Sequence, residues 1–259
     1  SGNKDRFYRK HWEVSEFKVY RPIASGGADA WLLPQIRDTV NWSKDGEEMR
    51  RSQTITRLTN KDRYGIEGLT WTYIKETGRR FGYLPEGTLF SQKGLLLASR
   101  GEVGIWVLMA YLNSNLFTAL MLSQTFEREW NAGEVGAAPW IEELSGKTAL
   151  AEAAKEQYQI KVRQRTNTPI SPYYTGPSLL PGEHRKEFYN RYPHGGSVQF
   201  ELSSNGADAS RSFRQSVKKL EDRRNRIEVQ LQSIQSNIDS EIFKVVDISS
   251  ESEEEIRSE

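Results

Sequence analysis

The stretch that decides the fold runs from residue 67 to 140 and contains GLTW (68–71), LPEGTLF (84–90), VGIWVLMAYLNSNLFTALML (103–122) and GEVGAAPW (133–140). Pro and Gly punctuate the second piece and Gly opens the first, which predicts short extended runs. In the third piece, apolar residues recur at positions 105, 108, 109, 112, 116, 117 and 120. This spacing predicts a helix over 103–122, amphipathic or fully buried. With a further strand at 133–140, the stretch predicts a strand, a core helix and a second strand.

The composition limits the functions that the chain can serve. A length of 259 residues is enough for one large domain, or for a domain with a helical appendage. There are no cysteines, which excludes disulfides and thiolate metal sites and fits a reducing cytoplasm. The three histidines, His11, His184 and His194, are scattered along the sequence. We therefore expect a cytoplasmic protein without a histidine-based metal site.

The apolar run at 103–122 raises the question of a membrane span. It contains Asn113, Ser114 and Asn115 and is only marginally long for a span. We therefore interpret it as a buried core helix and expect no membrane partner. No signal peptide is visible, and the sequence begins with Ser1 rather than Met. We accordingly expect a fragment of a longer protein.

Local composition predicts the other elements before residue 210. Aromatic and β-branched residues indicate strands, runs of Ala, Glu, Lys and Gln indicate helices, and Pro with Gly indicates loops. The elements predicted in this way are a strand at 12–17 that ends before Pro22, a strand at 40–42, a helix start near Glu47, a helix over 148–163, a loop over 167–177 and a strand over 197–202.

The last informative element begins near Ser210. Residues there are spaced alternately by four and three positions, which is the pattern of a heptad seam. The seam positions are Phe213, Val217, Leu220, Arg224, Ile227, Leu231, Ile234 and Ile238, and Arg224 alone breaks the apolar series. A helix of about 30 residues would span about 45 Å. It could pack against its own protein or self-associate through 213–238, and a short acidic helix is expected at 250–257.

The predicted fold class is α+β, a small twisted mixed sheet with packed helices and a long C-terminal helix. We expect an α+β domain over 1–209, and the heptad helix with a short acidic segment over 210–259. The net charge is +1, yet residues 1–100 hold 18 Lys and Arg against 12 Asp and Glu, and residues 241–259 hold 2 against 7. A basic body beside an acidic tail is compatible with polyanion binding, although ordinary domains often carry a mild positive excess.

Several short motifs resemble a known family in their order and spacing. The motifs are GLTW at 68–71, LPEG at 84–87, LNS at 112–114, GEV at 133–135 followed by Pro139, and NW at 41–42 followed by DGE at 45–47. They resemble the target-recognition domains of adenine-specific DNA methyltransferases of the BREX (PglX-like) and type IIG kinds. The resemblance covers residues 2 to about 180. It implies a domain that recognises a DNA sequence for restriction-modification or phage defence.

Basic residues cluster on both sides of GLTW. Arginine can bind phosphates or read guanine edges, and neighbouring aromatic residues can pack on sugars or bases. For either cluster taken alone, a solvated surface loop is the alternative interpretation. Within the resemblance, we interpret as DNA contacts Arg50, Arg51, Arg57, Lys61, Arg63, Arg79 and Arg80, with Arg6, Arg9 and Lys10 near the entrance of the DNA cleft.

The sequence shows no catalytic constellation, because it has no Gly-rich cofactor loop after a strand, no zinc signature and no nucleophile elbow. In the segment 168–173 the prolines are separated and Thr168, not Asn, stands directly before the first of them, so it is not an Asn-Pro-Pro-Tyr site. Our first hypothesis is a DNA-recognition domain without its catalytic domain. The resemblance implies that the catalytic domain of the same parent chain binds S-adenosylmethionine and methylates a flipped adenine of double-stranded DNA. The alternative is a protein-interaction module that acts through the heptad helix.

Overall fold

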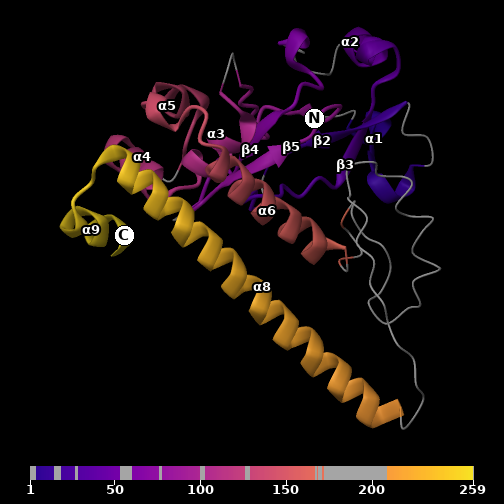
Figure 1. Ribbon diagram of the computed structural model, residues 1–259. Helices are drawn as coiled ribbons and strands as arrows, with labels where there is room; N and C mark the ends of the chain where they lie inside the picture. Colours follow the sequence, from indigo (N-terminus) through magenta and orange to yellow (C-terminus); the bar gives the residue numbers. More distant parts are fainter. Residues whose placement is uncertain are drawn as a thin grey trace.

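The computed structural model describes residues 4–14, 19–26, 29–52, 60–75, 78–99, 103–125, 129–166, 168, 171 and 209–258. Strands and helices mix within this part of the chain, and a long helix ends it (Figure 1), so the predicted α+β class is confirmed. The strands are β1 (Tyr8–Lys10), β2 (Tyr20–Ala24), β3 (Asp38–Asn41), β4 (Gly68–Trp71), β5 (Phe81–Leu84) and β6 (Leu89–Phe90). The helices are α1 (Lys4–Phe7), α2 (Glu47–Arg51), α3 (Ile105–Leu112), α4 (Asn115–Gln124), α5 (Ala132–Ala137), α6 (Thr148–Arg165), α8 (Ala209–Val246) and α9 (Ser250–Ser258), with 3-10 turns η1 (His11–Glu13), η2 (Ser43–Gly46), η3 (Lys61–Arg63) and η4 (Glu142–Leu144).

Two small sheets form the β part of the fold. The first has the order β1-β3-β2-β6, in which β3 pairs antiparallel with both neighbours and β2 pairs parallel with β6. The second is the antiparallel pair β4-β5. Leu32 pairs with β5 from outside the sheet, because its N–H donates to Phe81 O at 2.8 Å and its carbonyl accepts from Tyr83 N at 3.0 Å. This contact brings two backbones together at Gly82, where a Cβ would lie 2.0 Å from Ala30 O.

The main core lies where β4 and β5 meet α3, α4 and α6. Phe81, Phe117 and Trp130 are at most 1% exposed, and the ring centroids of Phe81 and Phe117 lie 5.7 Å apart. Trp71 is also buried, and its Nε1 donates to Trp130 O at 2.8 Å. The aromatic residues of the motif-rich stretch are therefore core residues, as the sequence predicted for its central helix.

The single helix predicted over 103–122 is wrong, because the chain forms α3 and α4 with a bend of 64° between them. The break lies at Asn113 and Ser114, which are buried and polar. Ser114 is the N-cap of α4, and its Oγ accepts from Phe117 N at 3.1 Å. In the described part of the chain no single helix has the length and apolarity of a membrane span. The bent pair α3–α4 meets that test of length and composition when its two helices are taken together.

Two further strand predictions are wrong. Residues 133–140 begin inside helix α5, because Asn131 Oδ1 accepts from the N–H groups of Gly133 and Glu134, and Glu134 Oε2 accepts from Asn131 N at 2.9 Å. This reciprocal capping box starts a helix in place of a strand. At the N-terminus, Trp12 lies in η1 and is 51% exposed, so the expected strand at 12–17 is not formed over its described residues.

The structure confirms five of the predicted elements. The strand at 40–42 corresponds to β3, the helix start near Glu47 to α2, the helix over 148–163 to α6, and the two C-terminal helices to α8 and α9. Helix α8 runs beside α6, and its N-terminal half, orange in Figure 1, extends beyond the end of α6. Leu231 and Ile238 of the seam are buried, so from Ile227 onward the seam packs against its own protein. The side chains of Phe213, Val217 and Leu220, the strand 197–202 and most of the loop 167–177 lie outside the described residues. The domain boundary after residue 209 stays a prediction.

Candidate nucleic-acid interface

Arg80, expected from the sequence to contact DNA, lies inside the fold. Its side chain is only 1% exposed, and its guanidinium carbon lies 3.6 Å from the centroid of the Trp130 ring. Its Nη2 donates to Lys75 O at 3.2 Å. Burial lowers the pKa of Arg80 to about 10. A side chain in this position supports the core beneath β5 and presents no donor to a phosphate outside.

Arg79 connects three elements of the fold. Its Nε donates to Asn113 O at 3.0 Å, and its Nη2 donates to Asn115 Oδ1 at 2.9 Å and to Asp239 Oδ2 at 3.2 Å. The Asp239 side chain is 1% exposed, and its Oδ1 accepts from Asn115 N at 2.8 Å. Burial raises the pKa of Asp239, while the hydrogen bond from Asn115 and the charge of Arg79 oppose that rise. Arg79 therefore holds α8 to the α3–α4 bend.

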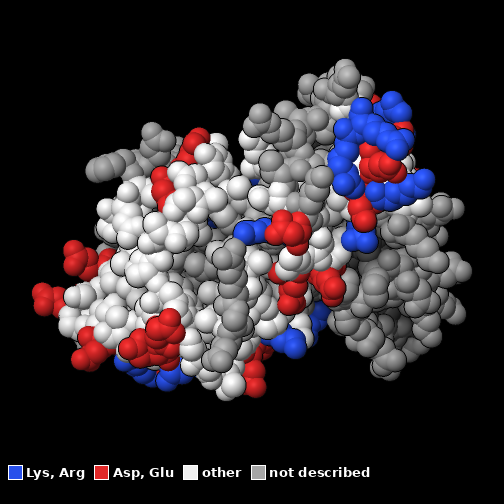
Figure 2. Space-filling view, turned by 90° about the horizontal axis from the view of Figure 1, so that it is seen from above, with Lys and Arg blue, Asp and Glu red and all other residues white. Residues whose placement is uncertain are grey.

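The predicted contacts on α1, β1 and α2 are Arg6, Arg9, Lys10, Arg50 and Arg51, and we call this set the N-terminal cationic face. Three of them pair with carboxylates at 2.5 Å: Arg6 with Glu48, Lys10 with Asp38, and Arg51 with Glu47. Figure 2 shows positive side chains mixed with acidic ones on the side where α1 and α2 lie. The pairs of Arg6 and Arg51 are exposed on both sides and therefore weak, so a phosphate could replace their carboxylates, whereas Asp38, the partner of Lys10, is only 15% exposed.

Arg9 and Arg50 have different partners, because they donate to backbone carbonyls. Arg9 Nη1 donates to Asp5 O at 2.5 Å and to Tyr8 O at 2.7 Å, and Arg50 Nη2 donates to Asp45 O. Among the described residues, no carboxylate lies within ion-pair distance of either side chain. Their charge is therefore not neutralised locally, and they are the cations of this face that an anion could approach at least cost.

The remaining sequence-predicted contacts are only partly placed. Arg63 lies in η3, half-exposed, with its Nε 4.0 Å from Asp62 Oδ2. Arg57 and the side chain of Lys61 lie outside the described residues. Five of the predicted residues thus lie on α1, β1 and α2, where Arg6 of α1 pairs with Glu48 of α2, while Arg80 is buried and Arg79 is half-buried beside Asp239.

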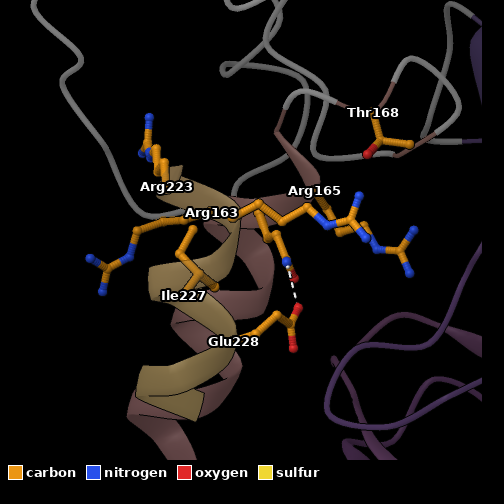
Figure 3. A pocket seen from close by; sticks show the side chains of 8 residues that line it. Arg163, Arg165, Thr168, Arg223, Ile227 and Glu228 are labelled. Carbon is orange, nitrogen blue, oxygen red and sulfur yellow. Dashed lines mark hydrogen bonds between the residues drawn. The ribbon is translucent and has the colours of Figure 1, made fainter. Parts of the chain in front are cut away.

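A second basic site, which we call the arginine hollow, lies between the end of α6 and the middle of α8. It has a volume of about 520 Å³. Its lining residues are Arg163, Gln164, Arg165, Thr168, Arg223, Arg224, Ile227 and Glu228. Figure 3 shows these residues where the last turn of α6 meets α8, with Arg223 and Arg165 extending to opposite sides and the hydrogen bond between Gln164 and Glu228 below them.

The arginine hollow carries an excess of positive charge. Its carboxylate, Glu228, accepts from Gln164 Nε2 at 2.9 Å and lies 3.8 Å from Lys161 Nζ. Burial lowers the pKa of Arg223, and the charges of Arg226 and Arg163 lower it further. The described residues place no carboxylate within ion-pair distance of Arg163, Arg165 or Arg224. The hollow therefore gathers like charges with little local compensation.

Sequence analysis did not select this site, although one signal pointed to it. Arg224 interrupts the apolar seam at the position that faces the end of α6, where Arg163 and Arg165 stand two residues apart. A cation in a seam position has to face either solvent or an anion. The contact between α6 and α8, which joins residues about 60 positions apart, could not be deduced from the spacing alone.

No group of three or more metal-ligating side chains occurs within the part of the chain that the structure describes. His11 is buried, 6% exposed, with its ring edge-on to Trp12 at a centroid distance of 4.9 Å. This arrangement is that of a packed side chain.

Comparison with known proteins finds relatives in one class of enzyme. No family model matches the chain. It is 31% identical over 173 residues to the adenine-specific methyltransferase BrxX of Escherichia coli O9:H4 (strain HS), a match that covers 62% of this chain and 14% of BrxX. It is 24% identical over 165 residues to the adenine-specific methyltransferase PglX of Lacticaseibacillus casei (strain Zhang), covering 56% and 14% respectively. The chain thus shows weak homology to BrxX and PglX over about 60% of its length, and the match spans about a seventh of each relative.

Proposed function

We propose that this chain is the DNA sequence-recognition part of an adenine-specific DNA methyltransferase of the BREX type. The observation that carries the proposal is the similarity to two adenine-specific methyltransferases, BrxX and PglX. Exposed cations on α1, β1 and α2 support it, since phosphate contacts supply most of the affinity of proteins for duplex DNA. The expected partner is double-stranded DNA.

The proposal divides the work between two parts of the parent protein. S-adenosylmethionine, when bound, supplies the methyl group. The arginine hollow does not fit this cofactor, because its arginines would repel the positively charged sulfonium and it offers only Ile227 as an apolar wall. We therefore assign S-adenosylmethionine and the flipped adenine to a catalytic domain outside residues 1–259. This chain would position the duplex and select its sequence.

On the N-terminal cationic face, Arg9 and Arg50 are the first candidates for phosphate contacts. Arg6, Lys10 and Arg51 would exchange a carboxylate partner for a phosphate, which is a change between two charge-assisted hydrogen bonds. We leave Arg79 and Arg80 out of the proposed DNA contacts, because the first is held by Asp239 and the second is buried.

From Ile227 onward, the part of the seam whose side chains the structure describes does not favour the alternative, a protein-interaction module built on the heptad helix. Leu231, Ile238 and Ile242 are already buried in the main core. Gln157 Nε2 also donates to Leu231 O at 3.2 Å and fastens the helix to α6. Self-association through this part of the seam would require α8 to leave its own protein first.

Binding of a mixed-sequence DNA duplex, measured by fluorescence anisotropy over a series of salt concentrations, tests the proposal. For a protein that recognises duplex DNA, the logarithm of the binding constant should fall linearly with the logarithm of the salt concentration, with a slope of about −0.9 for each phosphate contact. The double variant Arg9→Ala/Arg50→Ala should reduce the magnitude of that slope by about 1 to 2. Affinity that does not respond to salt would refute the proposal.

Two controls sharpen the result. Lys155→Ala removes an exposed cation from α6, away from the N-terminal cationic face, and should leave the slope unchanged. Selection of bound duplexes from a randomised library should enrich a defined sequence, since base-edge contacts select some sequences over others. Salt-dependent binding with no enrichment would mean a DNA-positioning role and would contradict sequence recognition.

A further inference from the structure

We propose that the arginine hollow between α6 and α8 is a second nucleic-acid contact, which binds the phosphates of the DNA backbone. The inference rests on the proposed function and adds a site that the sequence-predicted contacts do not include. It stands on the position of four arginines, Arg163, Arg165, Arg223 and Arg224, around a hollow of about 520 Å³.

The first argument is the charge balance. Four arginines line the hollow together with one acidic residue, Glu228, whose carboxylate is already engaged by Gln164 and lies near Lys161. Arg163 and Arg165 lie in the last turn of α6, where the helix dipole offers about half a negative charge. That half charge and one carboxylate cannot balance even the three arginines Arg163, Arg165 and Arg224. An anion is therefore the ligand that this arrangement favours.

The second argument is the chemistry of the lining. Apart from the arginines, the hollow offers the Thr168 hydroxyl, the Gln164 amide and a single apolar side chain, Ile227. Sites for a nucleoside or another small organic molecule are lined mainly by apolar and aromatic groups. Guanidinium groups with hydroxyl and amide donors are instead the groups that contact phosphate oxygens. The lining thus suits a phosphate and offers a base no aromatic ring to stack on.

The third argument is that the frame of the hollow is fixed before any ligand arrives. Gln157 Nε2 donates to both Leu231 O and Gln235 Oε1 at 3.2 Å, about two turns before the end of α6 along its interface with α8. Ile227 and Leu231 pack in the same interface. The helix backbones that carry the arginines are therefore held together, and binding costs mainly the ordering of their side chains.

The experiment uses the full 259-residue chain and compares wild type with Arg163→Ala/Arg224→Ala. Both side chains are exposed, so their removal should leave the thermal unfolding midpoint nearly unchanged. Lys155→Ala is the matched control, because it removes an exposed cation from another part of α6. With a mixed-sequence duplex, the double variant should lose about tenfold in affinity, and the magnitude of its salt slope should fall by about 1 to 2. Arg163→Lys/Arg224→Lys should recover part of both.

The outcomes separate this inference from the proposed function. If wild type binds DNA and the double variant keeps its affinity and slope, the hollow is not a backbone contact and the proposed function survives. If wild type shows no salt-dependent DNA binding, both fail. A free phosphate ion is the other source of the same chemistry. If inorganic phosphate weakens DNA binding by wild type no more than chloride of equal ionic strength, the backbone assignment holds. If it competes strongly with DNA in wild type and not in the double variant, the hollow is a free-phosphate site.

Discussion

The side-chain amide of Asn113 forms hydrogen bonds with both the backbone N–H and the backbone carbonyl of Phe81, each at 3.0 Å. Asn113 thereby takes the place that a neighbouring strand would have beside β5. Its Nδ2 also donates to Met109 O at 3.1 Å, within α3. One side chain therefore joins the end of a helix to a strand 32 residues earlier, at the position where the apolar run bends.

Asn113→Ala should lower the free energy of unfolding by about 1 to 3 kcal/mol, because it leaves the buried backbone N–H of Phe81 without a partner, while the carbonyl of Phe81 still accepts from Leu32 N. Urea denaturation followed by circular dichroism measures this. Asn237→Ala, at an exposed position of α8, is the matched control and should stay within about 0.5 kcal/mol of wild type. Equal effects of the two substitutions would contradict the bridging role.

Gly82→Ala should be more destabilising, by more than about 3 kcal/mol, because a Cβ at Gly82 would lie 2.0 Å from Ala30 O and 2.8 Å from Pro34 Cδ. Ala30 O is a backbone atom, so no side-chain rotation can relieve this contact. Gly136→Ala, in α5, meets nothing within 4 Å and should stabilise the protein by about 0.5 to 1 kcal/mol. Thermal unfolding of the pair gives the comparison. A tolerated Gly82→Ala would show that Leu32 does not pair with β5.

The sequence was sufficient where the determinants are local. The apolar seam of α8 and the helix-favouring composition of α6 each lie within the helix itself. These helices were therefore predicted correctly. It failed at the α3–α4 bend because the partner of Asn113 is Phe81, which only tertiary packing brings near. The strand predicted over 133–140 failed for a different reason. The Asn131–Glu134 capping box that starts α5 is local and was overlooked.

At the candidate site, too, the sequence could not predict what depends on tertiary packing. Arg80 follows Arg79 in a run rich in aromatic residues, and that pattern is equally typical of a DNA-contacting loop and of a cation packed on Trp130. Whether the Arg80 side chain is buried decides between the two, and its burial cannot be deduced from sequence spacing. Arg163 and Arg224 stand 61 residues apart in the sequence and share a surface only because α8 packs on α6.

The stability contributed by Asp239 should fall as pH rises. Burial raises the pKa of Asp239 above its unfolded value, so the folded state holds the proton more tightly. The resulting stability is fully present below the unfolded pKa of about 3.9 and is lost as pH rises through the folded pKa. Asp239→Asn does not titrate at this site. The free energy of unfolding of wild type minus that of the variant should therefore decrease from acidic to neutral pH, measured by urea denaturation. An increase would mean that the ion pair with Arg79 outweighs burial.

Removing the carboxylates of α2 should strengthen DNA binding if the N-terminal cationic face contacts phosphates. Glu47 and Glu48 pair with Arg51 and Arg6 and compete with DNA for these arginines. An exposed pair is worth about 0.2 to 1 kcal/mol, so Glu47→Gln/Glu48→Gln should tighten binding by about two- to tenfold at moderate salt.

Glu142→Gln/Glu143→Gln in η4 makes the same change in net charge with exposed adjacent glutamates, and it controls for long-range electrostatics. Fluorescence anisotropy with one duplex compares both variants with wild type. Equal gains in the two variants would attribute the effect to total charge. A gain confined to Glu47→Gln/Glu48→Gln would place the phosphates at α2, because screening limits a carboxylate's influence to about 10 Å at 0.1 M salt.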